Sequence, residues 1–507
     1  MFLTLIFVVF VIFVVHHLWI NRKMYQLSLK MPGPFMLPFV GSIHLMIGKS
    51  CEEFMRIFPE IASKFSSPFR FWLGTKQYII ISQPEDMKIV LNAVECLERG
   101  SVYQFIPPVL GDGVLTMSVH DWKRHRKFMN ASFSFSILQS FCPIFNDRAR
   151  MLVKRVRDFT KEHPQSVDFY KFMEGFTLDT VCQTTMGSKM NIQEGQNTEY
   201  LEGANNLMIC MARRLLNPFY HLDVFYKFSS LYNLQESGKK IVLGFVNKVV
   251  QRKRAEFNAS KVEVGWKRND RLPQVHIDQL LRLADCGEKS FTEEDVITEA
   301  GTLILTGFES TALSVSYCVL MIAMHPDVQN RLHDEIMDIL AGNSPDNLRY
   351  EDVKEFRYME QVIKETLRLF PVVPLVARSV SAPFKLNDYK IPEGVNIVLA
   401  FMLMHRNKSL WGADAHIFDP EHFAQDRIER MHPYVFLPFS GGPRNCMGIK
   451  YAYLVMKIAL VHLLYNFEFS TDLKLCDLKH RFEVTLKLVN KHMVRVKPRK
   501  SNILDSI

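Results

Sequence analysis

Cys446 lies in a glycine-rich stretch, beside an arginine and ahead of an apolar helical run. The stretch Phe439–Gly448 reads FSGGPRNCMG, and an apolar run from Tyr451 to Tyr465 follows it. Glycine has no Cβ, so it lets a chain turn sharply or approach a flat object closely. Arg444 precedes the cysteine by two residues, and a nearby cation lowers a thiol pKa and pairs with carboxylates. A thiolate between backbone N–H groups and a cation suits the ligation of haem iron.

Ordinary interpretations compete with this one. A single cysteine is most often a small buried apolar residue, and a glycine cluster is most often a turn. A phosphate-binding loop would need Lys-Ser or Lys-Thr after its last glycine, whereas Gly448 is followed by Ile449, Lys450 and Tyr451. The spacing excludes the phosphate loop, and the rest of the chain must decide between an inert and a ligating cysteine.

The chain begins with an apolar stretch, residues 1–20, whose first fifteen residues carry no charge. Twenty helical residues span about 30 Å, the thickness of a bilayer core. A cleaved signal peptide would need a basic start and a small-residue cleavage site, and both are missing. Arg22 and Lys23 follow the stretch, and positive charge there predicts that the remainder faces the cytosol. We expect a transmembrane anchor at 1–20, a basic, proline-rich hinge at 21–41 and a haem-binding domain at 42–507.

The cysteine pattern indicates the cellular compartment of the chain, and its net charge indicates the kind of partner that it binds. The nine cysteines of the 507 residues are irregularly spaced and form no Cys-x-x-Cys pair, which indicates reduced thiols on the cytosolic side. The net charge is +9, and no nucleic-acid motif accompanies it. We therefore expect no nucleic-acid partner, and a basic face that suits an acidic protein or anionic lipid.

Hydrophobic periodicity predicts a mainly helical domain with small sheets. The longest predicted helix starts at the N-cap Thr292 and ends near Met324, and because it is apolar on most faces it must cross the core. Aromatic side chains crowd Leu215–Leu231 and would cover a pocket or touch the membrane surface. The other predicted elements are a strand at 78–82, helices at 84–96, 121–129, 137–161, 170–186, 236–257, 326–341 and 350–370, and short strands within 384–400.

Polar residues interrupt the longest helix at Thr306-Gly-Phe-Glu-Ser-Thr311. Hydroxyls in a helix often only bond back to the i−4 carbonyl, and a buried acid is costly without partners. A glycine that weakens the helix beside an acid and two alcohols indicates a functional site instead. Gly307 would leave a groove for oxygen, and Ser310 or Thr311 with Glu309 would relay protons.

Two residue pairs add to this pattern. Glu365 and Arg368 share one helix face among apolar neighbours, which indicates a buried ion pair rather than an ordinary surface pair. Trp122 and Arg126 place two donors about one turn apart, within reach of a haem propionate, although a basic surface helix would look the same.

Taken together, these stretches resemble the cytochrome P450 family of haem-thiolate monooxygenases. The family's signature Phe-x-x-Gly-x-Arg-x-Cys-x-Gly is matched at 439–448, and its Glu-x-x-Arg is matched at 365–368. The landmarks follow in family order along essentially the whole chain, and the segments 122–127 and 442–446 look most like insect microsomal members of the family-4 clade. The resemblance implies the cytochrome P450 fold, mainly α with small β-sheets, preceded by the N-terminal transmembrane helix.

The resemblance also implies roles for single residues. Cys446 would be the metal ligand of haem b in a loop that includes Phe439, and the catalytic residues would be Glu309, Ser310 and Thr311. The residues that hold the haem propionates would be Trp122, Arg126, Arg378 and Arg444.

Two positions depart from the family pattern. His422 stands where the family often adds an arginine to the Glu365–Arg368 lock, and imidazole lacks the bidentate fork, which predicts a weaker lock or other partners. Thr306 stands where some family-4 members carry a glutamate that esterifies haem. We therefore expect non-covalent haem.

The implied activity is the insertion of one atom of O2 into a lipophilic substrate, such as a fatty acid, steroid, terpenoid or xenobiotic. Electrons would come from NADPH through a separate reductase, with cytochrome b5 as a further candidate donor, at the endoplasmic reticulum membrane. The chain has no nicotinamide or flavin motif, so the reductase must be separate. A haem-thiolate isomerase or dehydratase and a non-catalytic haem sensor stay as alternatives, and Glu309 with Ser310 argues against the sensor.

Overall fold

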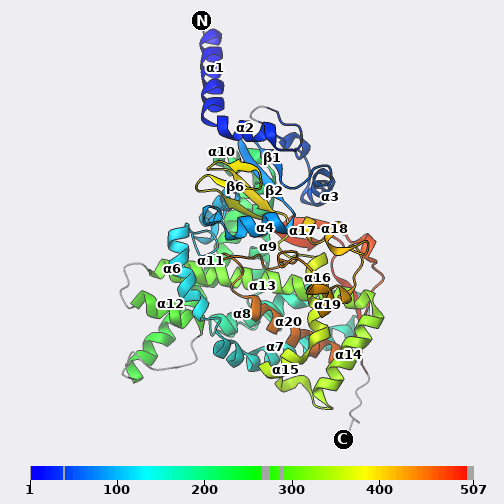
Figure 1. The fold of residues 1–507 in the computed structure, drawn as a ribbon. Helices are drawn as coiled ribbons and strands as arrows, with labels where there is room; N and C mark the ends of the chain where they lie inside the picture. The colour runs from blue at the N-terminus through cyan, green and yellow to red at the C-terminus, as the bar shows by residue number, and fades with distance from the viewer. Residues whose placement is uncertain (1, 38–39, 164, 265–274, 286–290, 500–507) are drawn as a thin grey trace.

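The computed structural model describes residues 2–37, 40–163, 165–264, 275–285 and 291–499. The chain is mainly helical with small sheets, and α1 projects from the side that carries β1, β2 and β6 (Figure 1). The helices are α1 (Phe2–Ile20), α2 (Arg22–Lys30), α3 (Cys51–Ala62), α4 (Pro84–Asn92), α5 (Pro107–Leu110), α6 (Val119–Ala131), α7 (Phe135–Glu162), α8 (Tyr170–Thr185), α9 (Glu199–Leu216), α10 (Asp223–Lys227), α11 (Ser230–Val264), α12 (His276–Asp285), α13 (Glu293–Met324), α14 (Pro326–Leu340), α15 (Tyr350–Glu355), α16 (Arg357–Leu369), α17 (Phe401–Met404), α18 (Lys408–Trp411), α19 (Gln425–Ile428) and α20 (Ile449–Asn466).

A five-stranded sheet in the order β1-β2-β8-β5-β3 lies beside the helices, and three smaller sheets are β10-β11, β4-β12-β9 and β6-β7. The strands are β1 (Phe69–Leu73), β2 (Lys76–Ile81), β3 (Glu98–Arg99), β4 (Val167–Asp168), β5 (Val376–Ser379), β6 (Phe384–Leu386), β7 (Tyr389–Ile391), β8 (Asn396–Leu399), β9 (Phe467–Ser470), β10 (His480–Glu483), β11 (Thr485–Leu488) and β12 (Met493–Pro498). Short 3-10 helices include η3 (Ser101–Phe105), η5 (Pro218–His221) and η7 (Pro420–Phe423).

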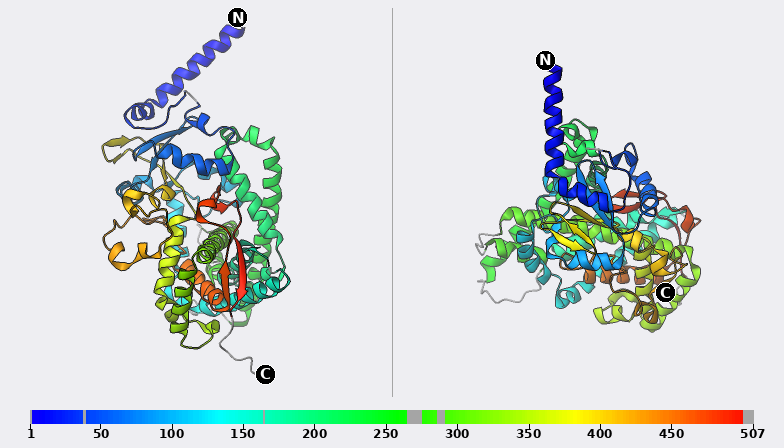
Figure 2. Two further views of the ribbon diagram at one scale, coloured as in Figure 1. Left: turned by 90° about the vertical axis from the view of Figure 1, so that its right-hand side faces the viewer. Right: turned by 45° about the horizontal axis from the view of Figure 1, so that its top comes forward.

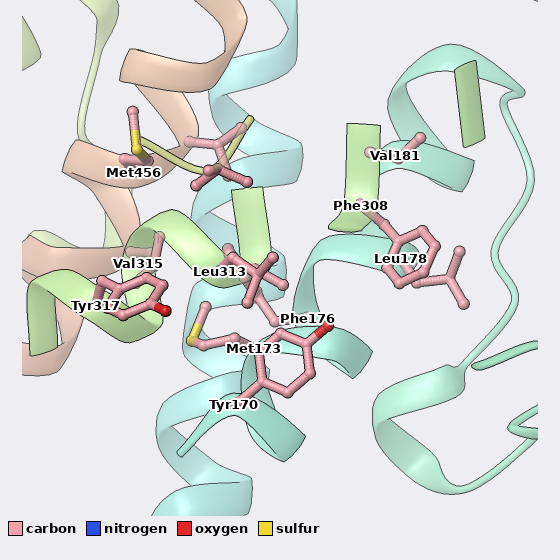
Figure 3. Close-up of a cluster of buried hydrophobic side chains, with 14 of the residues drawn as sticks. Tyr170, Met173, Phe176, Leu178, Val181, Phe308, Leu313, Val315, Tyr317 and Met456 are labelled. Carbon is pink, nitrogen blue, oxygen red and sulfur yellow. The ribbon is translucent and has the colours of Figure 1, made fainter. Parts of the chain in front are cut away.

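Helix α13 begins as its sequence predicts and forms the centre of the core. The Thr292 hydroxyl accepts a hydrogen bond from the Asp295 amide, and the Asp295 carboxylate accepts one from the Thr292 amide, which completes a capping box. Apolar side chains of α8, α13 and α20 meet in one buried cluster, in which Phe308 of α13 lies beside Leu178 of α8 (Figure 3). Burial of α13 on almost every face explains why its sequence shows little amphipathic pattern.

The predicted helix at 350–370 is wrong in one respect, because the structure divides it into α15 and α16 at Phe356. The Glu335 carboxylate of α14 accepts hydrogen bonds from the amides of Tyr358 and Met359, at 2.7 and 3.0 Å. A carboxylate that satisfies free amides stabilises a new helix N-terminus there. That cap comes from another helix, so the local sequence of 350–370 does not contain it.

Two parts of the chain, α13 and the pair α1 and α2, are long and apolar enough to cross a membrane, judged by length and composition. Among the residues that the structure describes, α13 alone is long and apolar enough by itself, but 83% of its most apolar window is buried inside the protein. Residues 4–20 of α1 meet the same criterion together with α2, as a pair bent by 65°. Helix α1 stands clear of the body in every view (Figures 1 and 2), with Phe2 76% exposed and Trp19 67% exposed.

The predicted hinge at 21–41 starts with α2, and α2 is fixed to the sheet. The Tyr25 ring stacks on Trp72 of β1 at 4.9 Å, and the Trp72 indole N–H donates to the Ser28 hydroxyl at 2.8 Å. Arg70 donates to the carbonyls of Ser28 and Pro34, at 2.6 and 2.7 Å. These contacts hold α2 and the residues that follow it against β1.

Candidate functional site

The loop that carries Cys446 closes on itself through backbone hydrogen bonds. The Cys446 amide donates to the Phe439 carbonyl at 3.0 Å, and the Asn445 amide donates to the Gly442 carbonyl at 3.2 Å. Gly442 has a φ of +67°, and a Cβ at this position would overlap the carbonyl of Leu91. Only glycine therefore fits there. Helix α20 begins three residues after the cysteine, so the positive end of its dipole lies near the sulfur.

The surroundings of the Cys446 thiol act on its pKa in two opposite directions. Its side chain is accessible, yet protein atoms crowd around it, and this burial raises the pKa of the Cys446 thiol. The Gly448 amide and the Arg126 guanidinium act in the opposite direction and favour the thiolate. Within the described part of the chain, no group of three His, Cys, Asp or Glu side chains could hold a metal ion. A single protein thiolate is compatible with haem, whose iron has a macrocycle as its other main ligand.

A cluster of buried arginines lies at the end of the five-stranded sheet. Arg99 of β3 and Arg378 of β5 are directly opposite one another in an antiparallel pair, an unfavourable position for two like charges. Arg378 and Arg444 are 2% and 3% exposed. Burial, followed by the charge of Arg99, lowers the pKa of Arg378 to about 9 and that of Arg444 to about 10.

Guanidinium nitrogens in this cluster have no hydrogen-bond partner among the described residues: Nη1 of Arg378, and Nε and Nη1 of Arg444. Buried donors without acceptors are rare and costly. A group with two carboxylates would neutralise these cations and satisfy these donors, so the cluster fits the two propionates of haem b. Sequence reasoning missed Arg99, since nothing in its local sequence shows that β3 will pair with β5.

Trp122 and Arg126 of α6 are brought to this region from the helix side. The Arg444 guanidinium lies over the Trp122 ring, 4.6 Å from its centre. Arg126 donates to the Asn445 carbonyl at 2.7 Å and to the Asn445 side-chain oxygen at 2.9 Å. In this arrangement Trp122 supports Arg444, and Arg126 braces the cysteine loop.

The side chains of Glu309, Ser310 and Thr311 on α13 make no hydrogen bonds to one another. The Ser310 hydroxyl donates to the Thr306 carbonyl and the Thr311 hydroxyl donates to the Gly307 carbonyl, both at 2.8 Å. The Glu309 carboxylate turns toward other elements, where it is bonded by Tyr170, Thr485 and Lys487. A relay from Glu309 to Ser310 would therefore require the carboxylate to rotate.

Glu365 and Arg368 form a buried lock. Arg368 donates through Nε and Nη2 to the two carboxylate oxygens of Glu365, each at 2.7 Å, with both side chains 0% exposed. His422 of η7 adds a third contact, because its Nδ1 lies 3.0 Å from a Glu365 oxygen. Its Nε2 lies 3.3 Å from Asp414. The histidine thus reaches the lock and links it to a second carboxylate.

An apolar cavity adjoins the arginine cluster. Its wall includes Val373, Leu375, Val376 and Ala377, which run directly up to Arg378. None of the lining residues is charged, and Tyr78 and Tyr103 bring the only lining hydroxyls. The other lining residues are Met46, Phe54, Phe58, Phe71, Leu73, Ile80, Val102, Phe105, Ile106, Met211, Leu215, Leu216, Val398, Phe482 and Val484.

Comparison with known proteins agrees with this geometry. The family model for Cytochrome P450 matches residues 31–493. The chain is 30% identical over 493 residues to "Probable cytochrome P450 313b1" of Drosophila melanogaster, across 96% of this chain and 97% of that protein. It is 30% identical over 491 residues to "Cytochrome P450 4c21" of Blattella germanica, across 95% and 96% of the two chains. Family members are monooxygenases that bind haem b non-covalently through a cysteine thiolate. The match over nearly the full length shows that the chain belongs to the cytochrome P450 family.

Proposed function

We propose that this chain is a membrane-anchored monooxygenase that acts on a lipophilic substrate with electrons from NADPH through a separate reductase. The observation that carries the proposal is the position of an uncharged cavity next to a cluster of buried arginines whose free donors fit the two propionates of haem b. An apolar wall favours substrates such as a fatty acid, steroid, terpenoid or xenobiotic, because burial of apolar surface drives their binding.

Different residues of this chain have different roles around the haem. Cys446 ligates the iron, and Arg99, Arg378 and Arg444 bind the propionates. When bound, the haem supplies the activation of O2. Ser310 and Thr311 hold hydroxyl protons on the central helix. Glu309 would pass a proton to them by first accepting one and then turning transiently from Tyr170, Thr485 and Lys487. Glu365, Arg368 and His422 hold the protein behind the cysteine loop.

The membrane assignment rests on two apolar surfaces. Helix α1 together with α2 meets the length and composition criterion for a membrane span, and apolar side chains of α1 such as Phe2 and Trp19 are exposed. A second surface lies on η5, α10 and the residue that follows, where Phe219, Phe225 and Phe228 are 59%, 54% and 89% exposed. We place the anchor in the endoplasmic reticulum with the body in the cytosol, where the reductase, and cytochrome b5 as a second donor, would reach a basic face.

NADPH-dependent O2 consumption tests this function. Haem-loaded protein with a flavin reductase should consume O2 and oxidise members of a panel of fatty acids, steroids and terpenoids. Turnover of a panel member without the reductase would instead show an isomerase or dehydratase, and no turnover at all would favour a sensor. In parallel, Cys446→Ala should abolish the thiolate band in the carbon monoxide difference spectrum, whereas Cys476→Ala, an exposed cysteine elsewhere, should keep it.

Ser310→Ala tests the proton relay. Loss of the hydroxyl should raise the share of NADPH that ends in hydrogen peroxide rather than product, and Ser310→Thr should keep the wild-type share because it keeps the hydroxyl. An unchanged share in Ser310→Ala would remove this residue from the relay. Ser314→Ala, one turn further along α13, is the matched control, because its hydroxyl makes the same kind of bond to the Ser310 carbonyl at 2.8 Å.

A further inference from the structure

Two residues of the β10–β11 hairpin bond the same carboxylate oxygen on α13. The Thr485 hydroxyl donates to Oε1 of Glu309 at 3.2 Å, and Nζ of Lys487 lies 3.1 Å from the same oxygen. Tyr170 of α8 donates to the other oxygen at 3.0 Å. Glu309 and Lys487 are each 4% exposed. One buried carboxylate therefore joins the hairpin, α8 and the central helix.

The hairpin has two different faces. Residues directly opposite in an antiparallel pair point to the same side, and the register sets Glu483 opposite Thr485 and Phe482 opposite Leu486. Lys487 is two residues beyond Thr485, so it shares the face of Thr485. That polar face meets Glu309 of the central helix, whereas Phe482 and Leu486 belong to the other, apolar face.

The apolar side of the hairpin forms part of the cavity wall. Phe482 and Val484 both line the cavity, and the Phe482 ring lies 5.4 Å from Phe54 of α3, another lining residue. Val484 occupies the turn with a φ of +64°, an uncommon position for a β-branched residue. Such a turn persists only when its surroundings hold it.

The Lys487 ammonium compensates buried negative charge on the polar face of the hairpin. Its Nζ donates to the Asn205 side chain at 2.8 Å and lies 3.6 Å from Glu483, which is 5% exposed. Without this ammonium, the buried carboxylate of Glu309 would lose its cation, whereas Glu483 would keep the Arg481 guanidinium at 2.7 Å. A buried charge that loses its partner is unfavourable, so the hairpin would move away from α13.

We propose that Lys487 is a positioning residue for the substrate, because its ion pair with Glu309 fixes the wall formed by Phe482 and Val484 relative to the helix that carries Ser310. The proposal rests on the proposed monooxygenase function. The distance between wall and helix decides which carbon of a lipophilic chain lies at the reacting centre, and a displaced hairpin changes that carbon as well as the fit of any apolar ligand.

The test compares three haem-loaded full-length variants with the wild type. Lys487→Met removes the ammonium and keeps the length of the side chain. Lys487→Arg keeps the cation. Glu483→Gln removes two pairs, with Arg481 and with Lys487, that lie entirely within the hairpin, and it leaves the bond to α13, so it is the matched control. Hydrogen–deuterium exchange of amides 480–488 reports the position of the hairpin, and fluorescence titration with N-phenyl-1-naphthylamine reports the apolar cavity.

In Lys487→Met we expect exchange in 480–488 to accelerate at least tenfold and the dissociation constant of the probe to rise at least fivefold. Lys487→Arg and Glu483→Gln should stay within twofold of the wild type in both. Lys487→Met in a Glu309→Gln background leaves no stranded anion on α13, so both changes should be smaller there than in Lys487→Met alone. On dodecanoic acid, Lys487→Met should also shift the position of hydroxylation.

Wild-type exchange and probe affinity in Lys487→Met would overturn the proposal, and so would equal effects in Glu483→Gln. Neither measurement depends on turnover. If the wild type oxidises nothing with NADPH and reductase while the hairpin variants differ as expected, the proposed function fails and the positioning role stands.

Discussion

The Nε2 atom of His405 accepts a hydrogen bond from the backbone amide of Leu437 at 2.9 Å. The carbonyl of the same histidine accepts a hydrogen bond from Arg368 at 2.9 Å, and Leu437 lies two residues before the cysteine loop. His405 therefore connects the Glu365–Arg368 lock to the loop that holds Cys446. As an acceptor from an amide, its Nε2 must be unprotonated.

Acid should weaken this connection. Burial and then the charges of Arg368 and Arg406 lower the pKa of His405 from 6.5 to about 3. Between about pH 3 and pH 6.5, His405 binds a proton in the unfolded chain but not in the folded chain. The contribution of His405 to the free energy of unfolding is therefore fully present above pH 6.5 and is lost as the pH falls from 6.5 to about 3. At pH 5 the loss from this one group is about 2 kcal/mol, because one pKa unit corresponds to about 1.4 kcal/mol. Thermal unfolding of haem-loaded wild type and His405→Gln between pH 5 and 8 checks this, and an equal slope in both would contradict it.

Gly442→Ala should prevent the cysteine loop from forming. The new Cβ would overlap the Leu91 carbonyl, a backbone atom that cannot move aside as a side-chain tip could. Gly48→Ala is the control, since Gly48 has a similar φ of +74° but no neighbour within 4 Å of the added atom. We expect haem content per chain to fall more than tenfold in Gly442→Ala and to stay near wild type in Gly48→Ala.

Arg378→Met should loosen haem binding. A charge-assisted hydrogen bond is worth about 1.5–3 kcal/mol, which corresponds to roughly a ten- to hundredfold faster transfer of haem to an excess of apomyoglobin. Lys127→Met removes an exposed cation from α6 and should leave the transfer rate unchanged. A rate in Arg378→Met equal to that of the control would mean that Arg378 does not bind a propionate.

The two side chains that donate to Glu365, Arg368 and His422, should differ in their effect on stability. Arg368→Ala strands the buried Glu365 carboxylate and should destabilise the protein by about 3–5 kcal/mol. His422→Ala removes one hydrogen bond from Glu365 and should cost about 1–3 kcal/mol. Arg56→Ala, which breaks an exposed pair with Glu60, should cost less than about 1 kcal/mol. The order of the three unfolding midpoints is the measurement, and a His422→Ala midpoint equal to that of Arg56→Ala would exclude His422 from the lock.

Much of the fold and site was predictable where one stretch of chain holds the whole signal. The capping box at Thr292 and the glycine of the cysteine loop are local, and the sequence shows both. The break at Phe356 depends on Glu335, and the partner of Arg99 is Arg378, almost 280 residues away in the sequence. The orientation of Glu309 depends on a hairpin near the C-terminus. Residue spacing alone does not show such contacts, because they arise only when separate elements pack.

Deletion of residues 2–20 should release part of the protein from membranes. Helix α2 keeps its contacts with Trp72 and Arg70, so the body should still fold and bind haem. Residual membrane binding should depend on the exposed aromatic surface, and Phe219→Ser with Phe225→Ser and Phe228→Ser should remove it. Flotation with liposomes measures both steps, and full membrane binding after the deletion and the three substitutions would contradict the anchor assignment.

The opposed arginines Arg99 and Arg378 link the stability of the folded chain to haem binding. Their mutual repulsion and the free Nη1 donor of Arg378 act against the folded chain, and the two propionates would relieve both, so cofactor binding contributes directly to folding stability. A chain made faster than haem is supplied would remain in the state that proteases degrade. The cellular amount of this protein should therefore follow the haem supply even when its synthesis is constant.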